Sequence, residues 1–108
     1  MTFGLSNATI EKIRSVFVRC PQVEKAVLYG SRAKGTFRNG SDIDLTLFGD
    51  GLTYELLSRI SRELDDLLLP HSFDISLFAD IRDADVIDHI RRVGVAFYEK
   101  SDPLRGCD

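Results

Sequence analysis

Two short segments that alternate apolar and polar residues, separated by an amphipathic segment, constrain the fold of this chain more than any other feature. Residues 43–48 and 73–78 alternate in steps of two, which is typical of half-buried β-strands. Between them, from Thr53 until Pro70, leucine and isoleucine recur at helical spacing. The stretch predicts strand, helix and strand in succession, as in an α/β protein.

The remaining sequence adds helices and strands on both sides of this unit. Local patterns predict a helix at 6–20, a strand at 23–29, a short helical stretch at 32–34, a helix from about 86 to Gly94 and an edge strand at 95–98. We expect an α/β (α+β) fold, with a small mixed sheet of three or four strands and helices packed on one face.

The length of 108 residues allows one hydrophobic core and predicts a single domain. We place this domain at 1–108, with its core at about 23–98 and a frayed tail at 101–108. A hydrophobic content of 44% with 29% charged residues is typical of globular proteins, so the chain is expected to fold.

Charge and hydropathy exclude several classes of function. A net charge of −3 argues against direct binding of a long nucleic acid, which needs a surplus of lysine and arginine. No apolar run approaches the roughly 20 residues that cross a bilayer, and the N-terminus lacks signal-peptide features, so we predict a cytoplasmic protein without a membrane partner. Cys20 and Cys107 form neither a disulfide framework nor a metal-ligand spacing.

A glycine–serine pair followed by basic residues ends the first predicted strand. Gly30 permits a tight turn and a close backbone approach, while Ser31 supplies a hydroxyl and a backbone N–H that suit phosphate oxygens. Arg32, Lys34 and Arg38 add positive charge for a triphosphate, although each could instead pair with a surface carboxylate. Together with the acids that follow, the pair indicates nucleotide binding.

Two aspartates at the mouth of the second strand indicate a metal site. Asp42 and Asp44 flank one residue, so their side chains emerge on one face with Cα atoms roughly 6 to 7 Å apart. Asp74 lies on the next predicted strand and joins them if that strand is a neighbour of the second. Oxygen ligands favour Mg²⁺, with Mn²⁺ as the alternative. Three carboxylates would accommodate two such ions, and a pair of ions suits nucleotidyl transfer.

These features resemble the DNA polymerase beta superfamily of nucleotidyltransferases: Gly30 and Ser31, a gap of ten residues, the pair Asp42 and Asp44, and then Asp74. The small size is similar to that of the minimal nucleotidyltransferase (MNT) domain, which accompanies a helical HEPN-domain protein as the antitoxin of a toxin–antitoxin pair. The resemblance spans roughly residues 23–98.

The resemblance implies a nucleotidyltransferase fold and transfer of AMP from ATP to a hydroxyl group. Carried over by position, Gly30 and Ser31 hold the nucleotide phosphates, while Asp42, Asp44 and Asp74 bind the metal ions. In antitoxin members the acceptor is a tyrosine of the HEPN toxin, whose ribonuclease is thereby silenced. A cognate HEPN-domain protein is therefore the expected partner, in a homo- or hetero-oligomer.

Other interpretations of the same residues stay open. The chain could be a binding module that neutralises its toxin by occlusion, or it could transfer a nucleotide to a small molecule such as an aminoglycoside. Solvated acids and an ordinary turn are the plainer interpretations of the site residues. His71 and His89 have no partner at a ligand or triad spacing, so we predict that both are surface residues.

Overall fold

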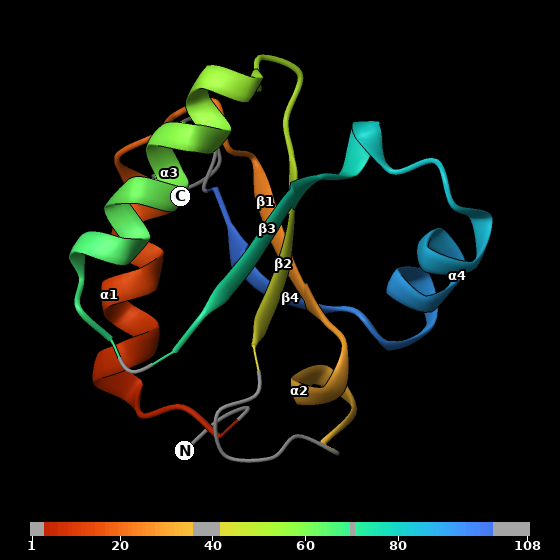
Figure 1. Cartoon of the computed structure of the whole chain (residues 1–108), viewed down its shortest axis with the longest axis horizontal. Helices are drawn as coiled ribbons and strands as arrows, with labels where there is room; N and C mark the ends of the chain where they lie inside the picture. Colours follow the sequence, from red (N-terminus) through yellow and green to blue (C-terminus); the bar gives the residue numbers. More distant parts are fainter. Residues whose placement is uncertain (1–3, 36–41, 70, 101–108) are drawn as a thin grey trace, which may run out of the picture.

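A four-stranded mixed sheet forms the centre of the protein, seen here in a computed structural model that describes residues 4–35, 42–69 and 71–100 (Figure 1). The elements in chain order are α1 (Asn7–Val18), β1 (Lys25–Tyr29), α2 (Ser31–Lys34), β2 (Ile43–Phe48), α3 (Tyr54–Asp66), β3 (Phe73–Leu77), the 3₁₀ turn η1 (Phe78–Asp80), α4 (Ala84–Val93) and β4 (Val95–Glu99). The predicted α/β class is confirmed.

The strand order is β3-β2-β1-β4, and only the β2–β3 pair is parallel. A parallel pair requires a crossover connection, and α3 is that crossover because it lies between the two strands in sequence. Pairing aligns Ile43 with Phe73 and continues to Leu47 with Leu77. The expected neighbourhood of the second and third strands is therefore present.

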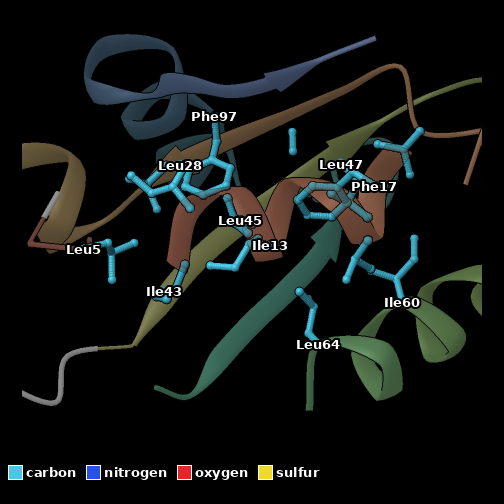
Figure 2. Close-up of a cluster of buried hydrophobic side chains, with 14 of the residues drawn as sticks. Leu5, Ile13, Phe17, Leu28, Ile43, Leu45, Leu47, Ile60, Leu64 and Phe97 are labelled. Atoms are coloured by element: carbon cyan, nitrogen blue, oxygen red, sulfur yellow. The ribbon is translucent and has the colours of Figure 1, made fainter. Parts of the chain in front are cut away.

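Helices α1 and α3 cover one face of the sheet, and the core lies between them and the strands (Figure 2). Ser6 starts α1 by accepting a hydrogen bond from the Thr9 N–H, and Thr53 caps α3 in the same way. The inward positions of the strands are apolar, as their period of two requires. The large side chains that are fully buried in the core include Leu5, Ile13, Phe17, Leu28, Ile43, Leu45, Leu47, Ile60, Leu64 and Phe97.

Helix α4 lies on the opposite side of the sheet from α1 and α3 (Figure 1). The buried residue of α4, Ile90, lines the same pocket as Val27 of β1. Val27 lies on the face of the sheet opposite to the main core, which contains its neighbours Ala26 and Leu28. Asp83 caps the start of α4, and the helix ends at Gly94 as the sequence predicts. Several element ends lie inside the predicted bounds: α1 ends at Val18, β1 begins at Lys25, α3 ends at Asp66 and β3 ends at Leu77.

None of the helices in the described part of the chain is long and apolar enough to cross a membrane.

Replacing Leu64 with alanine tests the packing of α3 on the sheet. Leu64 is 0% exposed, so its truncation leaves a cavity and should lower the free energy of unfolding by about 2–5 kcal/mol. Leu68, near the end of the same helix, is 89% exposed, and Leu68→Ala should change stability by less than about 0.5 kcal/mol. Urea unfolding followed by circular dichroism measures both; equal losses would contradict the described packing.

Candidate functional site

A row of three polar side chains crosses the sheet at the end where β2 begins. Tyr29 on β1 aligns with Asp44 on β2, and Asp44 aligns with Asp74 on β3. Residues aligned in a sheet project to the same face, here the face opposite to α1 and α3. Asp42 is exposed and directly precedes β2. The structure thus brings Asp44 and Asp74 into register, with Asp42 two residues away.

Gly30 fits against this row because it has no side chain. Its φ of +79° lies in the left-handed region, and a Cβ atom there would overlap the Asp44 carboxylate oxygen Oδ2. The Gly30 carbonyl accepts a hydrogen bond from the Lys34 N–H at 3.2 Å, which closes the short helix α2 that starts at Ser31. The turn at Gly30 therefore lies directly beside the Asp44 carboxylate.

His89 reaches this turn from α4, so the prediction that it is a surface residue is wrong. The Gly30 N–H donates a hydrogen bond to His89 Nε2 at 3.2 Å, across 59 positions in sequence. The imidazole also lies edge-on to Tyr29, with ring centroids 6.2 Å apart and an interplanar angle of 78°. The position of His89 in the sequence could not reveal this contact, because the contact depends on how α4 packs against β1.

His71 is also no simple surface residue. It is half-buried, and its Nδ1 atom has no hydrogen-bond partner among the described residues. Burial lowers the pKa of His71, and the positive charge of Arg32 lowers it further. Arg32 itself is only 3% exposed. Arg32 therefore lies within the folded domain, close to His71, and not on its surface.

The basic residues predicted around the turn therefore differ in exposure. Lys34 is exposed on α2 and is open to an anionic ligand, in contrast to buried Arg32. Arg38 lies outside the described residues. Of the side chains that line the site, sequence reasoning missed Tyr29 and His89; for Tyr29 the available signal was its place immediately before Gly30, two positions beyond Val27 on the same strand face.

Burial, reinforced by neighbouring negative charge, raises the pKa of two groups at the site. The pKa of Asp44 is raised, mainly by burial, then by Asp74 and Asp42, while His89 acts in the opposite direction. Burial raises the pKa of Tyr29 as well; the Ser76 hydroxyl lowers it, and Asp74 and Asp44 raise it further. An added cation would relieve this repulsion.

The donor set fits a hard divalent cation, because carboxylate oxygens are the ligands that Mg²⁺ and Mn²⁺ prefer. In the part of the chain that the structure describes, no group of three or more acidic, histidine or cysteine side chains is close enough together to hold a metal ion. The aligned pair Asp44 and Asp74 is therefore the core of any such site, and Asp42 would have to approach it.

A protein-family model described as "Polymerase beta, Nucleotidyltransferase" matches residues 11–103. The chain belongs to this nucleotidyltransferase family. The match includes every residue of the candidate site, from Tyr29 through His89. No curated protein sequence matches the chain significantly.

Solved structures share the fold of this nucleotidyltransferase domain. A chain of a toxin–antitoxin crystal structure with AMP-PNP superposes with a TM-score of 0.67 at 18% identity, over 89% of this chain and 75% of the other. A chain in the complex of tri-AMPylated Shewanella oneidensis HEPN toxin with MNT antitoxin gives 0.65 at 14% identity, over 89% and 74%. A chain of the MntA–HepT toxin–antitoxin structure gives 0.65 at 14%, over 88% and 74%.

Asp44→Asn should raise the melting temperature at neutral pH. The folded protein holds the Asp44 proton more tightly than the unfolded chain does, because the folded pKa is raised. Asp44 therefore favours folding at pH values below its ordinary pKa, and this contribution is lost as the pH rises through the raised pKa. The advantage of the variant should widen over the same interval, as calorimetry at a series of pH values would measure.

Asp50→Asn is the matched control, because Asp50 is an exposed acid in the turn after β2. Its melting temperature at neutral pH should stay close to that of the wild type, as expected for a change at an exposed position. A melting temperature of Asp44→Asn below that of the wild type at neutral pH would contradict the repulsion described here.

Proposed function

We propose that this domain is a Mg²⁺-dependent nucleotidyltransferase that transfers AMP from ATP to a hydroxyl group, with a tyrosine of a cognate HEPN-domain toxin as the acceptor. The observation that carries the proposal is the alignment of Asp44 with Asp74 beside the Gly30 turn. An ordinary solvent-exposed strand end would not require a glycine packed against a half-buried carboxylate of raised pKa.

The proposed roles follow the placement of each residue. Asp42, Asp44 and Asp74 hold the magnesium ions, with Asp44 in the central position between the other two. Gly30 and Ser31 seat the triphosphate, and Lys34 supplies exposed positive charge at the end of α2. When bound, magnesium neutralises phosphate charge and lowers the pKa of an attacking hydroxyl.

The transfer forms one bond and breaks one bond. The acceptor oxygen bonds to the α-phosphorus of ATP, the bond from the α-phosphorus to the bridging oxygen breaks, and pyrophosphate leaves. Asp74 is the exposed member of the aligned pair and is in the better position to accept the hydroxyl proton. Carboxylates placed in this way act as general bases when they lie within hydrogen-bond reach of the hydroxyl.

Two of the structurally similar complexes support the choice of donor and acceptor. One toxin–antitoxin structure was crystallised with AMP-PNP, an analogue of ATP, and another contains a tri-AMPylated HEPN toxin with its MNT antitoxin. The present chain shares their fold and has the carboxylates and the glycine turn that such a transfer needs. We extend their donor and their class of partner to it, together with the cytoplasmic location predicted from the sequence.

Asp44→Asn and Asp74→Asn should each reduce AMP transfer at least about 100-fold, because changing even the groups that support metal ligands costs about 10- to 100-fold. The protein is incubated with the protein encoded beside it, ATP and Mg²⁺, and the mass of that protein is then measured by mass spectrometry. The wild type should add AMP, and so should Asp50→Asn. Wild-type rates in Asp44→Asn would refute the assignment.

The same assay distinguishes the alternatives. Tight association of wild-type protein and partner without added mass would indicate inhibition by occlusion. Transfer to an aminoglycoside in the absence of any protein partner would indicate a small-molecule acceptor. Chelation of magnesium should stop the transfer of AMP without unfolding the protein, since the core is built from apolar side chains that do not bind metal ions.

A further inference from the structure

One polar contact near the site has no part in the roles given so far: the hydrogen bond from the Gly30 N–H to His89 Nε2. It is partly buried, and it joins α4 to the turn between β1 and α2. A backbone N–H that loses its partner in such a place costs free energy, so the imidazole is a functional acceptor rather than a chance neighbour.

Both polar backbone groups of Gly30 are thereby engaged. Its N–H is held by His89, and its carbonyl accepts from the Lys34 N–H at 3.2 Å. These two bonds fix the peptide groups on either side of Gly30, and the second of these groups carries the backbone N–H of Ser31. His89 holds the first of these peptide groups and α2 holds the second, so the two bonds together restrain the rotation at Gly30 that relates the Ser31 N–H to β1.

We propose that His89 is a positioning residue, which holds the Gly30–Ser31 turn in the orientation that binds the nucleotide phosphates. This inference rests on the proposed function, because it assigns a role to His89 only if the turn binds a nucleotide. It places a determinant of nucleotide affinity on α4, far in sequence from the glycine–serine pair.

The surroundings of His89 indicate that the positioning role depends on its Nε2 atom, which accepts the hydrogen bond from Gly30. Among the described residues, the Tyr29 ring lies edge-on to the imidazole, and the Asp44 carboxylate is close enough to interact with it electrostatically; both come from the sheet. On α4 itself, Arg92 pairs with Asp88 at 2.9 Å, in an exposed i,i+4 contact. The Tyr29 contact needs only an aromatic ring, whereas the Gly30 contact needs a hydrogen-bond acceptor, so substitution can separate the two.

Two variants of His89 test the proposal. His89→Phe keeps a ring against Tyr29 but removes the acceptor, and His89→Gln removes the ring but can place a side-chain oxygen near Gly30. The affinity for magnesium AMP-PNP, measured by calorimetry, should fall about 2- to 12-fold in His89→Phe, which corresponds to one lost hydrogen bond. It should stay within about 2-fold of the wild type in His89→Gln.

Amide hydrogen exchange supplies a readout that does not depend on the nucleotide. In the protein without nucleotide, exchange at the Gly30 amide should be faster in His89→Phe than in the wild type and largely restored in His89→Gln. Arg91→Gln, an exposed change on the same helix, is the matched control and should alter neither quantity. Urea unfolding of all variants accounts for any general loss of stability.

The affinities of the two variants decide whether His89 positions the turn. Unchanged AMP-PNP affinity in His89→Phe would overturn the positioning role, and so would equal losses in both variants, since packing of the ring would then be the cause. If the wild type itself bound no magnesium AMP-PNP, the proposed function would fail and the positioning role with it. Exchange at Gly30 would still show whether the His89 contact exists, so the two failures are distinguishable.

Discussion

The parallel pairing of β2 with β3 is the interaction on which the candidate site depends. Its register places Ile43 opposite Phe73, Asp44 opposite Asp74 and Leu45 opposite Ile75. The apolar members of these pairs face α1 and α3 in the core, so the acids must point to the other face. A shift of one residue would bury a carboxylate and expose a leucine. The hydrophobic effect thus aligns the two carboxylates, even though they repel each other.

Much of this arrangement could be predicted from local sequence patterns. The alternation in β2 and β3 indicates both the strands and the faces of Asp44 and Asp74, and the stripe of leucines indicates α3. The pairing of the strands is a different kind of information, because no short-range pattern specifies which strands become neighbours. The sequence therefore places Asp74 beside Asp44 only if the two strands are neighbours. The observed register shows that they are.

The residues whose surroundings could not be foreseen from the sequence are those packed against distant segments. His89 has a polar role because α4 packs against β1, and an isolated helix would only show a histidine among polar neighbours. Arg32 follows the glycine–serine turn and has the charge expected for a phosphate ligand, yet the fold buries it near His71. Burial depends on every element packed around a residue, and charge patterns along the chain do not contain that information.

Two features of the site lower the stability of the folded protein. Asp44 has a raised pKa and lies near two other acids. Gly30 has a positive φ, and only a residue without a side chain leaves room there for the Asp44 carboxylate. Neither feature improves the packing of the core, which is formed on the other face of the sheet. A cation that binds the folded state and not the unfolded chain would offset the repulsion by mass action. The same charges that weaken the free protein would then bind the cation, so local instability and ligand binding have a single electrostatic origin.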